Sequence, residues 1–173
     1  GLDLGVLVPI VEQPEVDPET GVRYFTPDTG AAAGPRYSMG DDGPVYDECV
    51  IRINTDAAGT SVRRRGEVAH EVFHCFQYHW AGYLVPYTPW VHEGTAAWAG
   101  FDFAGPAEPY ESNWWGAWVT RPERDLYTRS YDAIGLFALA DAHGGSPYAM
   151  IANLFSAPDL SQVLARTGPA LLR

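Results

Sequence analysis

The segment from Val68 to Trp80, VAHEVFHCFQYHW, restricts the fold of this chain more than any other stretch. It places three histidines, a glutamate and a cysteine within thirteen residues. Its apolar residues Val68, Val72 and Phe76 recur at intervals of four, which is typical of an α-helix that buries one side. Capping residues before it and a glycine after it predict one helix over residues 60–82.

Two of the histidines share one side of this predicted helix with a carboxylate beside them. His70, Glu71 and His74 form an HExxH pattern. Residues i and i+4 lie one turn apart on the same side of a helix, so both imidazoles can face one ion. Glu71 lies next to that ion without occupying a ligand position, as a general base for a zinc-activated water requires. The pattern therefore predicts a zinc site.

A third ligand is expected from the next predicted helix, residues 89–101. Glu93 follows His74 by nineteen positions and lies among apolar and aromatic residues. A carboxylate in such surroundings needs a partner. His92 is the rival ligand, but it points about 100° away from Glu93 around a helix. We therefore expect Glu93 to complete the site.

The motifs together resemble the gluzincin metallopeptidases of the MA clan, including the small bacterial peptidase MA-like domains. HExxH is followed after eighteen residues by a glutamate within a W-x-x-E-G-x-A pattern, and the resemblance covers roughly residues 45–168. It implies that His70, His74 and Glu93 bind zinc and that Glu71 is the general base. It also implies an oxyanion-stabilising tyrosine, which is Tyr131 or, as the alternative, Tyr127.

The resemblance extends to the substrate and has two departures. It implies that a peptide or protein substrate pairs with an edge strand near residues 46–54. Many gluzincins carry an acidic residue four positions after the ligand glutamate, where this chain has Ala97. Another group, with Asp102 and Asp132 as candidates, must then orient a zinc-bound histidine. The Gly-rich aminopeptidase signature is missing from the sequence, which favours an endopeptidase or an unknown specificity.

The predicted fold class is α+β and zincin-like, in one domain spanning residues 1–173. A strand- and loop-rich lobe, residues 1–59, precedes a helical lobe, residues 60–173, that carries the HExxH helix. The strongest strand is predicted at 45–53, where Cys49, Ile51 and Ile53 alternate onto one face. Weaker strands are predicted at 6–11 and 22–26, loops at 11–21, 26–36 and 39–44, and further helices at 130–145, 146–155 and 159–168.

Cys49 and Cys75 are either two buried thiols or a disulfide that ties a strand to the HExxH helix. We expect the disulfide, because exported proteins favour it, and we expect a secreted protein. The chain does not begin with Met and is interpreted as a piece of a longer one. Its oligomeric state is left open.

Composition limits the partners. The formal net charge is −11 and lysine is absent, which argues against nucleic acid. No apolar run approaches the length of about 18 residues that a membrane span needs. The competing function is a catalytically inactive binding or structural protein with the same fold.

Overall fold

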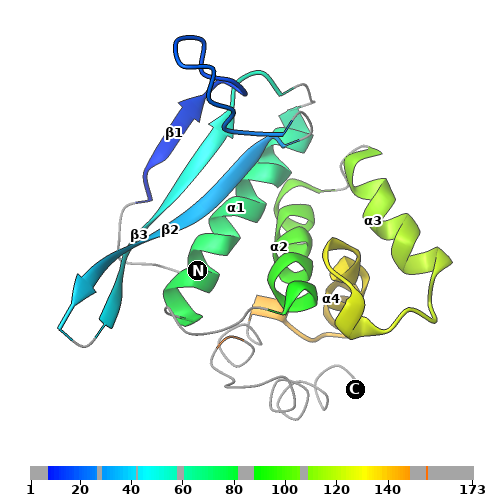
Figure 1. The fold of residues 1–173 in the computed structure, drawn as a ribbon. Coiled ribbons are helices and arrows are strands. Elements are labelled where there is room, and N and C mark those ends of the chain that lie inside the picture. The colour runs from blue at the N-terminus through cyan, green and yellow to red at the C-terminus, as the bar shows by residue number, and fades with distance from the viewer. Residues whose placement is uncertain are drawn as a thin grey trace.

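A small sheet lies on one side of a stack of helices in the computed structural model (Figure 1). The strands precede the helices along the chain, so the protein is α+β, as predicted. The structure describes residues 8–26, 29–41, 43–57, 61–81, 88–105, 109–148 and 155.

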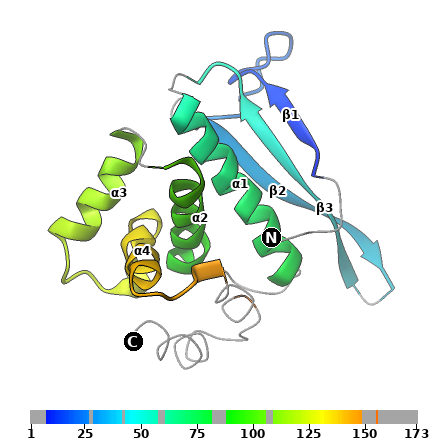
Figure 2. The same ribbon diagram turned by 180° about the vertical axis from the view of Figure 1, so that it is seen from behind.

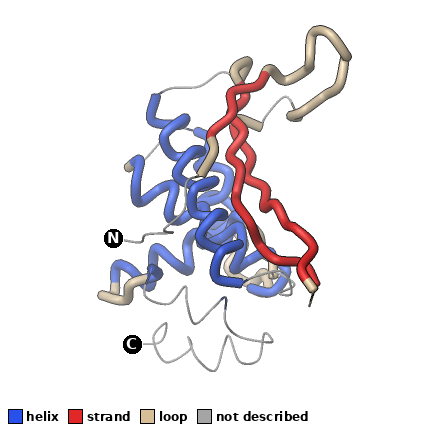
Figure 3. Tube along the Cα trace, turned by 90° about the vertical axis from the view of Figure 1, so that its left-hand side faces the viewer, coloured by secondary structure: helices blue, strands red, loops and turns tan. Residues whose placement is uncertain are grey.

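The sheet has three strands in these residues: β1 (Ile10–Gln13), β2 (Ala31–Gly40) and β3 (Gly43–Asn54). Their order is β1-β3-β2, with β1 parallel and β2 antiparallel to β3. Seen edge-on, the sheet occupies one side of the molecule and the helices the other (Figure 3). The predicted strand at 45–53 is confirmed, and it is the central one.

This strand order corrects the prediction that the edge strand lies near residues 46–54. Alternation identifies a strand with one buried face, but it does not distinguish a central strand from an edge. In the described residues the edge strands are β1 and β2, and residues 31–36 and 39–40 of β2 were predicted as loop. The Ala-Ala-Ala-Gly-Pro sequence of β2 has low β-propensity, and the strand forms through pairing with β3. Pro35 fits there, because proline is tolerated in edge strands.

The HExxH helix, α1 (Ser61–Ala81), lies between the sheet and α2 (Pro89–Ala104), an arrangement visible from behind in Figure 2. Both helices were predicted. The proline at the start of α2 fits the first turn of a helix. The two helices approach closely where Gly66 faces Gly100, since a Cβ on Gly100 would lie 2.7 Å from the Gly66 carbonyl oxygen. This close approach positions α2 beside the histidines.

Further helices pack on the far side of α2: α3 (Pro109–Thr120), the short 3-10 helices η1 (Leu126–Thr128) and η2 (Tyr131–Ala133), and α4 (Ile134–Ala142). The helix predicted at 130–145 corresponds to η2 and α4. Helix α3 was not predicted. The predicted helix at 159–168 and most of that at 146–155 lie outside the described residues.

Two apolar clusters hold these layers together. The larger one joins α2 to α4 and includes the fully buried Trp90, Ile134 and Phe137. The smaller one lies between the sheet and α1 and centres on Cys49 and Cys75. No helix among the described residues is long and apolar enough to cross a membrane.

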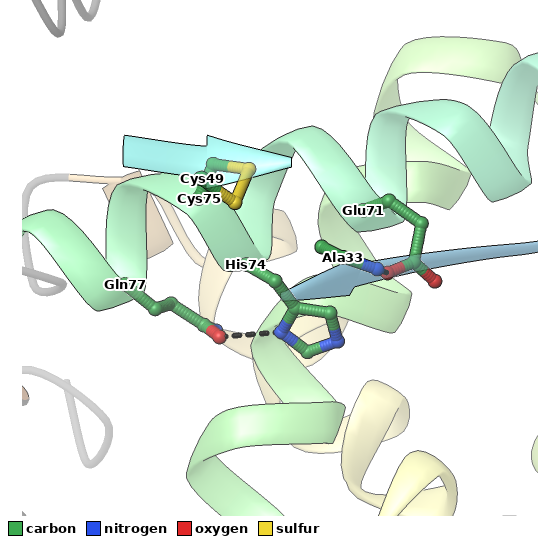
Figure 4. Close-up of a disulfide and its surroundings, with 6 residues drawn as sticks. All are labelled: Ala33, Cys49, Glu71, His74, Cys75 and Gln77. Carbon is green, nitrogen blue, oxygen red and sulfur yellow. Dashed lines mark hydrogen bonds between the residues drawn. A yellow bond between two sulfur atoms is a disulfide. The ribbon is translucent and has the colours of Figure 1, made fainter. Parts of the chain in front are cut away.

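The predicted disulfide is present. Cys49 on β3 and Cys75 on α1 are bonded, with their Cα atoms 5.4 Å apart (Figure 4). Both cysteines are fully buried. The bond fixes the turn of α1 that carries His74 against the central strand.

Candidate metal centre

Three predicted ligands meet at the interface of α1 and α2. His70 and His74 project from successive turns of α1, and their Nε2 atoms are 2.9 Å apart. Glu93 reaches them from the second turn of α2, with Oε2 at 3.3 Å from His70 Nε2 and 3.4 Å from His74 Nε2. The prediction that Glu93 comes close to both histidines is thus confirmed.

The triangle formed by these three atoms has the size that a tetrahedral zinc site needs. With zinc–ligand bonds of 2.0 to 2.1 Å, two ligands of a regular tetrahedron are about 3.3 Å apart. The observed edges are 2.9, 3.3 and 3.4 Å. In addition, Glu93 Oε2 is fully buried and accepts no hydrogen bond from the described residues. Two imidazoles and one carboxylate are also ligands that zinc commonly takes, so these residues fit the ion.

Charge and burial act strongly on these side chains. Burial alone raises the pKa of Glu93, but its contacts with His70, His74 and His92 outweigh burial and hold that pKa well below its usual range. Burial lowers the pKa of His74, whereas Glu93 and then Glu71 raise it, with a net increase. Glu93 is therefore ionised near neutral pH, which is the form that binds a cation.

Gln77 orients His74 from the next turn of α1 (Figure 4). Its Oε1 lies 2.6 Å from His74 Nδ1, while its Nε2 donates to the His92 carbonyl at 2.9 Å and to Thr95 Oγ1 at 2.8 Å. Because the amide nitrogen already has two acceptors, its oxygen faces Nδ1, and Nδ1 must donate. Neutral His74 then has its lone pair on Nε2, the atom that lies 2.9 Å from His70 Nε2 and 3.4 Å from Glu93 Oε2.

Gln77 is thus the group that contacts a predicted ligand histidine in place of an acidic residue at position 97, where this chain has Ala97. The two aspartates considered for orienting a histidine are engaged elsewhere. Asp102 accepts a hydrogen bond from Tyr148, and Asp132 pairs with Arg124 and Arg129. The HExxHxxQ spacing was visible in the sequence, but only the packing of α2 against α1 shows that the amide is fixed from both sides.

His92 lies closer to the centre than its position on the helix suggested. Its ring stacks on that of His74 with centroids 4.2 Å apart, and its Nδ1 lies 3.3 Å from Glu93 Oε1. His74, His92 and Glu93 thus form a second group of neighbouring ligand atoms. Burial, as the largest effect, lowers the pKa of His92. Since His92 contacts the other oxygen of Glu93, its position suits holding that carboxylate in place.

Glu71 lies beside the ligand triangle and contacts the edge strand β2. Its Oε2 accepts a hydrogen bond of 2.6 Å from the backbone N–H of Ala33 on β2 (Figure 4). Together with His70 and His74 it forms another group of possible ligands. However, the bond to Ala33 draws one carboxylate oxygen toward the sheet. The arrangement suits a base that is held near the ion.

The two candidate tyrosines have different surroundings. The ring of Tyr131 is stacked on His70, with centroids 5.6 Å apart, whereas Tyr127 packs edge-on against Trp90. Trp114 of α3 packs near both rings, with its centroid 4.7 Å from that of Tyr131 and 6.3 Å from that of His70. Only Tyr131 of the two is therefore adjacent to a predicted ligand. Trp114 was missed from sequence, because no motif surrounds it and α3 itself was not expected.

An apolar pocket of about 1150 Å³ lies away from the ligand triangle. Val68, Val72 and Phe76 of α1 line it, together with Phe103 of α2. None of the histidines or carboxylates of the metal centre contributes to it. Its size alone does not make it the site of chemistry.

The chain matches no family model, no curated protein and no solved structure.

Proposed function

We propose that this protein is a zinc-dependent peptidase of the gluzincin type, with endopeptidase activity. The observation that supports the proposal is the triangle of His70 Nε2, His74 Nε2 and Glu93 Oε2, with edges of 2.9 to 3.4 Å. Three protein ligands would leave one position on a bound zinc for water, which is the arrangement of catalytic rather than structural zinc.

Each residue of the centre has a defined task in this proposal. His70, His74 and Glu93 hold zinc, which when bound acidifies a water and polarises the substrate carbonyl. Glu71 takes the proton from the attacking water and later delivers it to the leaving amine. Gln77 keeps His74 in the tautomer that binds metal. Tyr131 donates a hydrogen bond to the oxyanion that develops on the substrate carbonyl.

The substrate is proposed to lie along β2. In the described part of the chain, the sheet order leaves one side of β2 without a strand partner. The N–H of Ala33 points from that side to Glu71. An extended peptide added at this edge, in place of the strand near 46–54 considered from the sequence, would run past the general base.

Export of the protein to an oxidising compartment is consistent with this activity. The Cys49–Cys75 disulfide persists in secreted proteins and is rare in reducing compartments. We therefore retain export as part of the proposal.

The proposal is tested with a matched pair of isosteric variants. Glu71→Gln and Glu93→Gln each neutralise one carboxylate of the centre. After zinc loading, metal analysis should find about one zinc per chain in the wild type and in Glu71→Gln, and much less in Glu93→Gln. Cleavage of a mixed peptide library should be abolished in both variants.

Three outcomes are decisive. A wild-type protein that takes up no zinc would refute the metal centre. Zinc loss in Glu71→Gln with retention in Glu93→Gln would exchange the roles of the two glutamates. Zinc binding without any peptide cleavage by the wild type would favour the inactive binding protein.

A further inference from the structure

A small pocket of about 190 Å³ adjoins the proposed catalytic centre. Glu67 and Glu71 of α1 line one side of it, and Gly30, just before β2, lines another. Trp114 and Tyr131 form an aromatic part of the wall. Because His70 also contributes, a substrate side chain in this pocket would lie next to the metal ligands.

Glu67 is the unusual member of this lining. It lies one turn before Glu71, and only 6% of its surface is exposed. Its carboxylate occupies the space where a side chain at position 30 would begin, since a Cβ on Gly30 would lie 2.0 Å from Glu67 Oε2. A glycine there admits the carboxylate to the pocket lining.

The carboxylate of Glu67 has remaining capacity to accept hydrogen bonds. Its Oε1 accepts from Nε of Arg63 at 2.8 Å. A carboxylate offers about four acceptor positions, so the contact with Arg63 leaves acceptor capacity for a second guanidinium. Burial makes an ionised carboxylate favour such additional donors. The proposed catalytic base Glu71 adds a second negative group to the same lining, which disfavours acidic side chains.

The aromatic wall supplies a second, independent feature. Trp114 and Tyr131 are stacked at 4.7 Å with their planes 20° apart, and Tyr131 is stacked in turn on His70. Cations bind to the faces of such rings. A guanidinium both stacks on aromatic faces and donates to carboxylates, whereas an ammonium is a compact, strongly hydrated charge. The combination therefore favours arginine over lysine.

We infer that this pocket selects substrates with an arginine side chain next to the scissile bond, bound by Glu67 and by the rings of Trp114 and Tyr131. The inference rests on the proposed peptidase function, because only that function makes the bound arginine part of a substrate. Binding of an arginine peptide can be measured separately from cleavage. The two ideas can therefore fail separately.

The binding test uses the Glu71→Gln protein, with and without zinc, so that peptides are not consumed. Two fluorescent peptides are compared by anisotropy, identical except that one has arginine and the other citrulline, which keeps the shape but lacks the charge. We expect the arginine peptide to bind about 10- to 100-fold more tightly, as a charge-assisted hydrogen bond warrants. Introducing Glu67→Gln as a second substitution should bring the ratio of the affinities for the arginine and citrulline peptides close to one.

Glu48→Gln provides the matched control. Glu48 also pairs with an arginine, Arg36, at 2.8 Å, but it lies on β3 and does not line the pocket. In the Glu71→Gln background, Glu48→Gln should leave the ratio of the affinities for the arginine and citrulline peptides unchanged. Equal binding of the two peptides before any change at Glu67 would overturn the inference. So would a loss of affinity in Glu67→Gln that is the same for both peptides, since that indicates a structural role.

Cleavage by the wild type then separates the two ideas. Mass spectrometry of library products should show arginine enriched at one position next to the cut. Cleavage without that enrichment refutes the selectivity and leaves the peptidase intact. Failure to cleave, combined with arginine-selective binding, refutes the peptidase and preserves the pocket as an arginine-binding site.

Discussion

The amide oxygen of Gln77 lies 2.6 Å from Nδ1 of His74, and both side chains are buried on α1. In metal sites, such a contact fixes the ring orientation and the tautomer of the ligand histidine. In the proposed zinc centre, an amide takes the place of the acidic residue that many gluzincins use. The amide can hold the orientation of the ring without adding a further negative charge to those of Glu93 and Glu71.

Replacing Gln77 by alanine should therefore weaken zinc binding about 10- to 100-fold, the usual effect of losing such a partner. Competition against a fluorescent zinc chelator measures the affinity, and thermal unfolding of the metal-free protein shows whether packing has changed. Thr95→Val is the control, because it removes one acceptor of the Gln77 amide but leaves the oxygen at His74. Unchanged affinity in Gln77→Ala would show that the histidine needs no such support.

Local spacing explains why part of the centre could be predicted from sequence. His70 and His74 share a helix, so their relation follows from helical geometry alone. Glu93 could be proposed because a helical hairpin returns it to the same place. His92 and Gln77 were harder, because their contacts depend on how closely α1 and α2 pack at Gly66 and Gly100.

The strand order of the sheet, in contrast, could not be predicted from local spacing. Nothing local in the sequence of β3 indicates how many neighbours it has. The alanines and glycine of β2 become a strand only because β3 offers hydrogen-bonding partners along its length, beginning with Ala31 opposite Ile53. Helix α3 and its Trp114 were likewise missed, because tertiary contacts with η2 and α4 stabilise the helix more than its own apolar pattern does.

Removing the disulfide by changing both cysteines to alanine should destabilise the protein by about 3.5 kcal/mol, from the entropy of closing a loop of 26 residues. Denaturant unfolding of the variant and the oxidised wild type measures the difference. The reduced wild type serves as control for the lost side-chain volume. Two reactive thiols in the denatured, non-reduced protein would contradict the presence of the bond.

Substituting Gly100 by alanine should cost about 1–3 kcal/mol, as overpacking commonly does. The new Cβ would lie 2.7 Å from the Gly66 carbonyl oxygen and 3.5 Å from the Cβ of His70, so α1 and α2 must move apart. We also expect weaker zinc binding, because the ligand triangle spans these two helices. Chemical denaturation and zinc titration measure the two effects.

Gly116 offers a matched control for the same substitution. It lies within α3, and a Cβ there meets no atom within 4 Å. Gly116→Ala should stabilise the protein by about 0.5–1 kcal/mol through helix propensity alone. If both variants were stabilised, the close approach at Gly66 would not limit the helix spacing.

Alkaline pH should act on the contact between Tyr148 and Asp102. Burial first, and then the charge of Asp102 and the hydrogen bond to it, raise the pKa of Tyr148 to about 12. An unfolded tyrosine has a pKa of about 10. A raised pKa means that the contribution to stability is complete below about pH 10 and is lost as the pH rises toward 12. Ultraviolet difference titration of the wild type against Tyr148→Phe should show one phenol ionising near pH 12 when folded and near pH 10 in denaturant. Identical midpoints in both conditions would mean that the contact between Tyr148 and Asp102 does not form.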